Sequence, residues 1–347
     1  MLSVRSAIVV LIASAIGTSA TPGLSLKVTG PDAVDGVDNL KVITTLINTG
    51  DETLKLLNNP LGPLSKMPTN TFAIINEQSG GVPRFNGVKV KYVANSAIKT
   101  GGADAFTILT PGQSVSVEHD LSAAYNFTES GVGKYYVEAN NVFQYVDAST
   151  QKATQIVAEV TEAHAASISG KLAVARPILQ RRATFTGNQN AFPRLSISHI
   201  SHHAANALSY LQSHTSATTR YTTWFGSYTS ARHTTVQTHF SNLNGNTYTS
   251  YHWDCTCTDS GTYAYVYPSD FGHVYLCGAF WSAPTTGTDS KAGTIIHEST
   301  HFTSNGGTSD YAYGQSAAKN LASTNPSQAV MNADSHEYFA ENNPVLS

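Results

Sequence analysis

The chain has 347 residues, enough for two domains of ordinary size, and its 41% hydrophobic and 12% charged residues describe a globular protein. A formal net charge of −3, without any basic cluster, excludes the charge pattern of a nucleic-acid-binding protein. Fifteen of the 20 Lys and Arg precede residue 183, whereas 11 of the 13 His follow it. Two differently built units therefore share the chain.

The first 20 residues have the three regions of a secretory signal peptide. Arg5 supplies the positive charge, residues 7–16 form a short apolar run, and residues 18–20 are a small-x-small cleavage site. No segment approaches the roughly 20 apolar residues of a membrane helix. We therefore expect a protein secreted to the extracellular space, with no membrane as a partner.

Residues 24–174 have the pattern of β-strands. Polar and apolar residues alternate in segments 24–29, 41–47, 88–93, 114–119 and 134–139, and Gly, Pro, Asn and Asp clusters separate these segments. The pattern predicts an antiparallel, β-sandwich-like domain over residues 21–182. Within it, Asn126-Phe-Thr is an acceptor site for N-glycosylation in a predicted loop.

A dibasic pair, Arg181-Arg182, lies where the composition changes. In an exported protein this pair is typical of a processing site, and two solvated arginines on a linker are the alternative. We expect residues 21–182 to be a propeptide, removed by a dibasic processing protease, and residues 183–347 to be the mature domain.

After this boundary the hydrophobic period changes from 2 toward 3.6. Helices are predicted at 196–211, 230–243, 313–323 and 326–341. A further helix is predicted to begin after a cap at Thr288 or Asp289, to run through His301 and to end at Gly306-Gly307. Strands 263–267 and 273–277 are predicted to form a β-hairpin. The expected fold class is α+β: a mainly helical domain with one β-hairpin, preceded by the β-sandwich-like domain.

The chain has three Cys, an odd number for an exported protein. Cys257 and Cys277 flank the predicted hairpin and can pair across it, which leaves Cys255 over. The sequence also permits pairing of Cys255 with Cys277, so the disulfide stays open at this point.

Residues 297–301 read His-Glu-Ser-Thr-His. Because residues four apart share one face of a helix, His297 and His301 can both direct a ring nitrogen at one Zn²⁺. Glu298, beside them, can accept a proton from an attacking water and return it to the leaving amine. The pattern predicts a catalytic zinc site, with an exposed helix carrying two histidines as the alternative.

A catalytic zinc site needs a third protein ligand. Asp310 lies nine residues beyond His301, after a Gly306-Gly307 pair that lets the chain turn back under the helix. Tyr313 carries a phenol that can donate to a developing oxyanion. Glu337 is an alternative third ligand, although it requires a more distant helix to close in.

Residues 297–301, followed by Gly-Thr-Ser-Asp-Tyr-Ala-Tyr-Gly at 307–314, match the HExxH plus GTxDxxYG signature. The chain thereby resembles the aspzincins, which are deuterolysin-type metalloendopeptidases, and among them the fungal peptidyl-Lys metalloendopeptidases. The resemblance covers essentially all of residues 184–347. It includes segments 209–212, 220–226, 255–257, 264–268, 274–281 and 331–339.

The resemblance implies a zincin-like catalytic domain with one Zn²⁺ held by His297, His301 and Asp310. It further implies that Glu298 is the general base and acid, and that Tyr313 stabilises the transition state. Asp334 and Glu337 would hold the lysine of a protein or peptide substrate in the S1′ pocket, so that cleavage falls on the amino side of lysine. Their spacing of three residues places both carboxylates on one helix face, and two solvated acids are the alternative.

One departure from the family concerns the cysteines. The resemblance implies a partner for Cys255 near the start of the mature domain, where this chain has Asn188. The predicted propeptide contains no Cys, so its inhibition of the enzyme must come from steric cover or another ligand.

Two other functions remain open from the sequence. One is the same zinc endopeptidase with broad, deuterolysin-like specificity. The other is a non-catalytic secreted binding protein with a structural zinc site, against which the open three-ligand set beside Glu298 argues.

Overall fold

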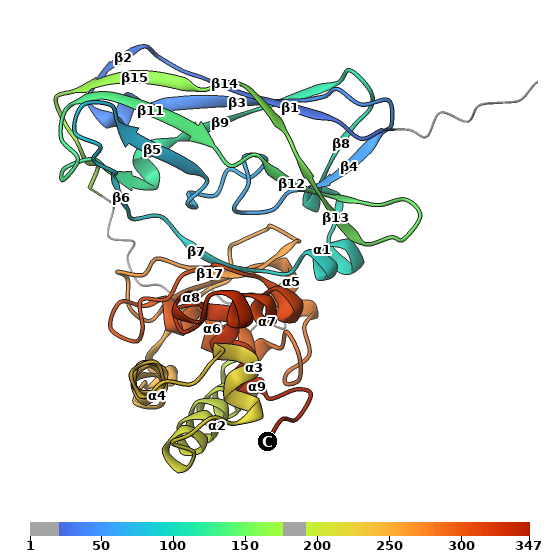
Figure 1. Cartoon of the computed structure of the whole chain (residues 1–347), viewed down its shortest axis with the longest axis vertical. Coiled ribbons are helices and arrows are strands. Elements are labelled where there is room, and N and C mark those ends of the chain that lie inside the picture. Colours follow the sequence, from blue (N-terminus) through green and yellow to red (C-terminus); the bar gives the residue numbers. More distant parts are fainter. Residues whose placement is uncertain (1–20, 176–191) are drawn as a thin grey trace, which may run out of the picture.

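A computed structural model describes residues 21–175 and 192–347 (Figure 1). The predicted signal peptide, Arg181, Arg182 and Asn188 lie outside the described residues. Within these two ranges, no helix has both the length and the apolar character needed to cross a membrane. Both helices and strands are present, which confirms the α+β class.

Residues 21–175, the β domain, form sheets that pack around one hydrophobic core. The strand orders are β14-β1-β3-β9, β2-β15-β11-β5, β13-β12-β4-β8 and the pair β10-β6. The elements are β1 (Leu24–Thr29), β2 (Ala33–Asp35), β3 (Lys41–Asn48), β4 (Leu54–Leu57), β5 (Phe72–Asn76), β6 (Arg84–Phe85), α1 (Ala94–Thr100), β8 (Phe106–Leu109), β9 (Ser114–Asp120), β10 (Tyr125–Asn126), β11 (Gly133–Ala139), β12 (Val142–Val146), β13 (Ala153–Val157), β14 (Glu159–Glu162) and β15 (His164–Ser169).

The alternation seen in the sequence explains these strands. Along β3, for example, Val42, Leu46 and Asn48 are buried while Lys41 and Ile43 are exposed, because successive side chains of a strand point to opposite faces. Asn126 ends the short strand β10 rather than lying in a loop, and its side-chain oxygen accepts the N–H of Thr128.

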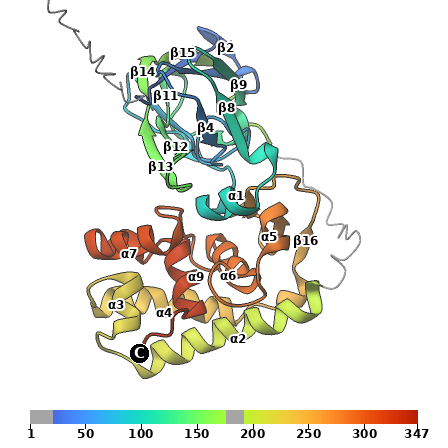
Figure 2. The same ribbon diagram turned by 90° about the vertical axis from the view of Figure 1, so that its right-hand side faces the viewer.

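Residues 192–347, the helical domain, contain most of the helices and one small sheet (Figure 2). Its elements are α2 (Phe192–Ser213), α3 (Thr219–Phe225), α4 (Ser230–Asn244), β16 (His252–Asp254), β17 (Thr262–Val266), β18 (His273–Leu276), α5 (Gly278–Ser282), α6 (Lys291–His301), α7 (Gly314–Thr324), α8 (Pro326–Ala329) and α9 (Ala333–Glu341). The antiparallel pair β17–β18 is the predicted hairpin. Helix α6 lies centrally, with Ile295 and Ile296 fully buried in the core.

The helix boundaries correct two expectations. Ser290, not Thr288 or Asp289, caps α6, because its hydroxyl accepts the N–H of Gly293. The helix predicted over 326–341 is two helices, α8 and α9, which are separated by residues 330–332.

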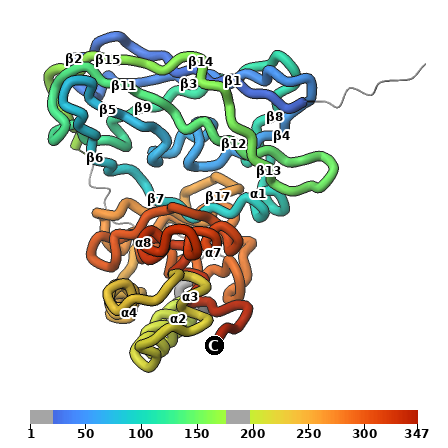
Figure 3. Tube along the Cα trace, viewed as in Figure 1, coloured from blue at the N-terminus to red at the C-terminus, as the bar shows by residue number. Residues whose placement is uncertain are grey.

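The β domain meets the helical domain along β7 (Lys89–Tyr92). This strand is present as predicted, but it belongs to none of the sheets of its own domain. It pairs antiparallel with β17 and completes the sheet β16-β18-β17-β7 of the helical domain. The chain trace in Figure 3 follows this segment down from the β domain and back. The prediction that residues 88–93 belong to the sandwich was therefore wrong.

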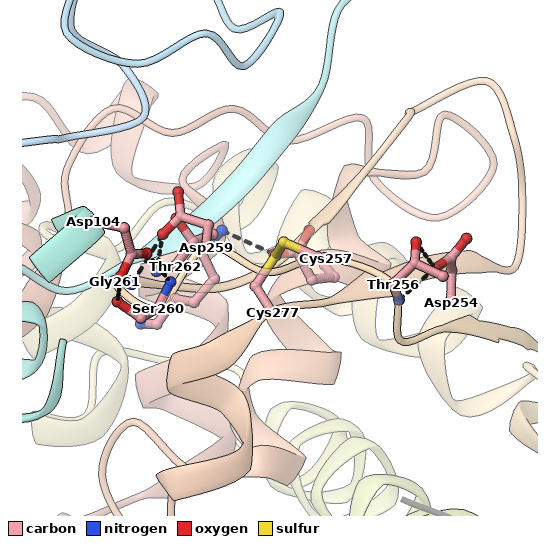
Figure 4. The surroundings of a disulfide bond; sticks show 11 residues. Asp104, Asp254, Thr256, Cys257, Asp259, Ser260, Gly261, Thr262 and Cys277 are labelled. Atoms are coloured by element: carbon pink, nitrogen blue, oxygen red, sulfur yellow. Dashed lines mark hydrogen bonds between the residues drawn. A yellow bond between two sulfur atoms is a disulfide. The ribbon is translucent and has the colours of Figure 1, made fainter. Parts of the chain in front are cut away.

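Cys255 is free, whereas a disulfide joins Cys257 to Cys277 (Figure 4). Beside it, Asp104 of the β domain accepts both the N–H and the hydroxyl of Ser260, at 2.8 and 2.7 Å, which makes a second contact between the domains. Burial raises the pKa of the half-buried Cys255 thiol to about 11, so this thiol is protonated at neutral pH.

Removing the disulfide is expected to lower the free energy of unfolding by about 3 kcal/mol, since the bond closes a loop with a sequence separation of 20. The variant is Cys257→Ser with Cys277→Ser, because a single substitution would leave a thiol that can pair with Cys255. Chemical unfolding of the full chain measures the change. Cys255→Ser is the control, and equal losses in both variants would contradict this role of the disulfide.

Candidate active site

Helix α6 and the loop after it bring together His297, His301 and Asp310. The Nε2 atom of His297 lies 3.2 Å from Oδ1 of Asp310, and that of His301 lies 3.1 Å from the same oxygen. All three side chains are nearly or fully buried. The sequence spacing of four places both rings on one helix face, and a left-handed Gly307, with φ 57°, lets the chain return toward the helix.

These three atoms fit a zinc ion. None of them has a hydrogen-bond partner among the described residues, although all are buried, and buried polar atoms are ordinarily paired. Tetrahedral ligands about 2 Å from a Zn²⁺ ion lie roughly 3.3 Å apart, which is close to both separations here. Asp310, rather than the alternative Glu337, stands beside both histidine Nε2 atoms.

The other ring nitrogens of the two histidines lie close to oxygen atoms. Nδ1 of His301 lies 3.0 Å from the carbonyl oxygen of Thr308, and Nδ1 of His297 lies 2.8 Å from Oδ1 of Asp334. A proton held on Nδ1 leaves the lone pair of Nε2 available for a metal. Glu337 Oε2 is 3.3 Å from the same His297 nitrogen.

The loop carrying Asp310 and Tyr313 is fixed by α9 and the residues before it. Oδ1 of Asn332 accepts the N–H groups of Tyr311 and Ala312, at 3.0 and 3.1 Å. Oδ2 of Asp334 accepts the N–H of Gly314 at 2.6 Å. These bonds satisfy backbone groups that a turn would otherwise leave unpaired, so the loop has a defined position above α6.

Glu298 and Tyr313 flank one peptide bond of β7. Glu298 Oε1 accepts the N–H of Lys91 at 2.8 Å, whereas Oε2 is buried and has no hydrogen-bond partner in the described part of the chain. The Tyr313 hydroxyl donates to the carbonyl oxygen of Val90 at 2.7 Å. Burial raises the pKa of Glu298 well above its ordinary value, although His297 opposes this, and such a shift suits a group that takes and returns a proton.

Asp334, Glu337 and Asp289 form a pocket around the ammonium group of Lys91. Nζ lies 3.0 Å from Asp334 Oδ1, 2.8 Å from Glu337 Oε2 and 3.1 Å from Asp289 Oδ1. The Lys91, Asp334 and Glu337 side chains are fully buried, and Asp289 is 23% exposed. We call these three acids the lysine pocket.

Three acids surround one ammonium group in the lysine pocket. Burial alone lowers the pKa of Lys91, but Asp334 and Glu337 outweigh it and hold this pKa well above its ordinary value. The lysine is therefore charged and replaces the water that the buried carboxylates lose. His297, Asp334 and Glu337 also have the spacing of a metal site, but here a lysine ammonium is the cation between the carboxylates.

The three ligands predicted from the sequence, His297, His301 and Asp310, lie together in the structure, and two of the three pocket acids were also singled out, whereas Lys91 and Asp289 were missed. Asp289 had been assigned a capping role, and its backbone is left-handed, with φ 52°, which directs the side chain to Lys91 and the Tyr338 hydroxyl. In the sequence, Lys91 is recognisable only as one lysine of a predicted strand in which polar and apolar residues alternate. The strand's partner, β17, lies about 170 residues further along the chain and could not be identified from local pattern.

Comparisons with known proteins show which family the chain resembles. The aspzincin family, described as lysine-specific metallo-endopeptidase, matches residues 210–341. A peptidyl-Lys metalloendopeptidase of Grifola frondosa is 60% identical over 347 residues, which covers 99% of each chain. One of Armillaria mellea is 53% identical over 351 residues, covering 100% of this chain and 99% of that one. The solved structure of a zinc peptidase from Grifola frondosa has 61% identity and a TM-score of 0.46, and it covers 47% of this chain and 100% of its own.

Proposed function

The chain belongs to the aspzincin family of metalloendopeptidases, and from this premise we propose that it hydrolyses peptide bonds on the amino side of lysine with one Zn²⁺ as cofactor. The family membership sets aside the alternative of a non-catalytic binding protein. The observation that carries the specificity is the buried Lys91 ammonium in the lysine pocket.

His297, His301 and Asp310 would hold the zinc ion, which supplies Lewis-acid chemistry to a carbonyl and lowers the pKa of water. Glu298 has one carboxylate oxygen free of hydrogen bonds, and this oxygen can take a proton from the attacking water. The other oxygen, Oε1, accepts the N–H of Lys91, so Glu298 can transfer the proton to the nitrogen of the leaving amine. The Tyr313 hydroxyl donates to the carbonyl oxygen of Val90, and it can stabilise the negative charge that develops on the carbonyl oxygen of the bond being cut.

The lysine pocket selects a compact cation. Its carboxylates are buried, so a neutral side chain would leave them without a partner, which costs several kcal/mol. Asp334 and Glu337 carry the S1′ role that the resemblance implies, and Asp289 supports the same ammonium from the other side. Broad, deuterolysin-like specificity is the poorer account of a pocket in which Asp334 and Glu337 are fully buried.

We also propose that the β domain is a propeptide, since β7 lies across the catalytic groups and excludes any other substrate. Removal would follow cleavage at Arg181-Arg182 by a dibasic processing protease. Secretion is supported by the signal-peptide pattern of residues 1–20 and by the disulfide, which needs an oxidising compartment.

The test is digestion of a denatured protein by the processed enzyme, followed by mass spectrometry of the peptides. New N-termini are expected to begin with lysine, and a sample treated with a chelator is expected to produce none. Zinc-dependent cleavage without a lysine preference would remove the proposed role of the lysine pocket. No cleavage by the zinc-loaded enzyme would contradict the proposed function itself.

A further inference from the structure

Strand β7 reaches the helical domain although the chain before and after it belongs to the β domain. It adds to the edge of the sheet next to β17, pairing Lys91 with Ala264, Val90 with Tyr265 and Lys89 with Val266. Addition of an extended segment to a sheet edge is a common way for a protein to bind a peptide, because main-chain hydrogen bonds hold the segment and pockets choose its side chains.

Three catalytic groups contact the two residues of a single peptide bond in this strand. Tyr313 donates to the carbonyl oxygen of Val90, and Glu298 accepts the N–H of Lys91, which belongs to the same bond. The N–H of Val90 lies 3.3 Å from Oδ2 of Asp310, one of the three predicted metal ligands. The Val90–Lys91 bond thus has a donor at its oxygen and a carboxylate at its nitrogen, as hydrolysis requires.

The lysine pocket fixes which bond occupies this position. Lys91 fills the pocket, whereas Lys89, two residues earlier, donates to the Ser309 hydroxyl at 3.2 Å and contacts none of the pocket acids. A shift by two residues would keep the same face and phase of the strand and would present Lys89 to the pocket. The structure has the other register, with Lys91 in the pocket and the Val90–Lys91 bond at the catalytic groups.

We propose that β7 is this enzyme's built-in first substrate: the β domain inhibits by placing Lys91 in the lysine pocket, and the chain then cuts its own Val90–Lys91 bond. The proposal rests on the proposed function and adds the site and the molecule on which the enzyme first acts. It also answers how a propeptide without Cys can block the metal site: the block is a bound peptide rather than a thiolate.

The step is an ordinary peptide hydrolysis. One water molecule adds its oxygen to the carbonyl carbon of Val90, Glu298 transfers the water's proton to the nitrogen of Lys91, and the carbon–nitrogen bond breaks. A carboxylate at Val90 and an ammonium group at Lys91 result, because the second proton of the water also passes to the leaving amine. Water can approach from a cleft of about 1170 Å³ between the domains, which is lined by Tyr92 on one side and by Asp310 and Tyr313 on the other.

The cut weakens the hold of the β domain on the active site. A carboxylate at Val90 and an ammonium group at Lys91 would replace the peptide bond whose oxygen contacts Tyr313 and whose N–H contacts Glu298, so the two residues would no longer be joined at the site. The strand is also no longer continuous across the two domains, so its two halves can leave separately. Cleavage at Arg181-Arg182 separates the domains along the chain, and cleavage at Val90–Lys91 removes the peptide from the site.

The first experiment uses the full chain loaded with zinc and compares it with Glu298→Gln. Mass spectrometry of the wild-type chain is expected to find a fragment that begins at Lys91, at a first-order rate that does not change on tenfold dilution, whereas Glu298→Gln stays intact. If the wild-type chain cuts added proteins before lysine but leaves Val90–Lys91 whole, this proposal falls and the proposed function stands. If it cuts neither, this proposal falls, and digestion by the processed enzyme decides the proposed function.

The second experiment removes the Lys91 ammonium group from the lysine pocket. Full-chain Lys91→Gln is expected to show no cut after Val90 and, before any processing, at least a roughly 30-fold higher activity on an added lysine peptide than wild type, because a buried charge pair is lost. Lys99→Gln, in which an exposed lysine of α1 is changed, is the matched control and is expected to behave as wild type. A Lys91→Gln chain that stays as inhibited as wild type would overturn the proposal.

A charge-conserving variant covers failure of Lys91→Gln to fold. Lys91→Arg keeps a cation in the pocket, but its planar guanidinium does not match a site for a compact ammonium, so self-cleavage is expected to slow at least about tenfold. Cleavage at the wild-type rate would contradict the role of the lysine pocket.

A chemical-modification experiment tests the placement of β7 independently of activity. Amine acylation of the Glu298→Gln chain is expected to modify Lys99 and to spare Lys91. Equal modification of both lysines would overturn the placement of β7.

Discussion

Glu298→Gln is expected to lower kcat of the processed enzyme by roughly 10²–10⁴-fold, which is the usual contribution of a general acid–base. Gln keeps the shape of the side chain and an oxygen that accepts the N–H of a bound lysine, as Glu298 Oε1 does for Lys91. Gln has an amide NH₂ group in place of Oε2 of Glu298, so it cannot take a proton from water there. In wild type this oxygen is buried and has no hydrogen-bond partner among the described residues. Steady-state kinetics on a peptide with one Xaa–Lys bond measures the change.

The zinc content of this variant is the control. Glu298 does not share the cluster of His297, His301 and Asp310, so the metal content is expected to equal that of wild type. KM is expected to change little, because the lysine pocket is untouched. A kcat within threefold of wild type, with zinc bound, would rule out Glu298 as the general base.

The grouping of His297, His301 and Asp310 was predictable from the sequence because its pattern is local. A spacing of four residues on a helix fixes the relative position of His297 and His301 whatever surrounds them. The Gly307 turn returns Asp310 within nine residues. Helix periodicity likewise placed Asp334 and Glu337 on one face of α9, although their approach to His297 needed the packing of α9 against α6.

The contacts between domains were not predictable in this way. The alternation of residues 88–93 identified a strand, but the period of two is the same whether a strand pairs within its own domain or with another. Choosing β17 as the partner depends on the charge match between Lys91 and acids about 200 residues away.

The capping residue of α6 was also missed. Ser290 and Asp289 are both good capping residues, and only the left-handed backbone of Asp289 distinguishes them.

A carboxylate of the lysine pocket also serves the metal site, which leads to the second prediction. Asp334 lies 3.0 Å from the Lys91 ammonium and 2.8 Å from Nδ1 of His297 through the same oxygen, while its other oxygen accepts the N–H of Gly314. All these partners are donors. Asn has only one acceptor oxygen, so Asp334→Asn leaves at least one buried donor facing an amide N–H₂.

Asp334→Asn is therefore expected to damage two properties at once. Loss of a buried charge should lower kcat/KM for a lysine peptide by roughly 10²–10³-fold. Loss of the acceptor that orients His297 should weaken zinc binding by about 10–100-fold. Competition with a chelator measures the zinc affinity, and kinetics at saturating zinc measures the effect on the lysine substrate.

Asp289→Asn makes the same chemical change on the other side of the lysine and separates the two effects. Asp289 contacts Lys91 and the Tyr338 hydroxyl but has no contact with either histidine of the metal site, and its left-handed backbone is one that Asn tolerates. Since this side chain is 23% exposed, solvent screens its charge, and the expected loss in kcat/KM is only about 3–10-fold, with unchanged zinc affinity. If Asp334→Asn keeps its zinc affinity, Asp334 does not orient His297. If Asp289→Asn weakens zinc as much as Asp334→Asn does, the coupling is a property of the pocket's total charge rather than of one shared oxygen.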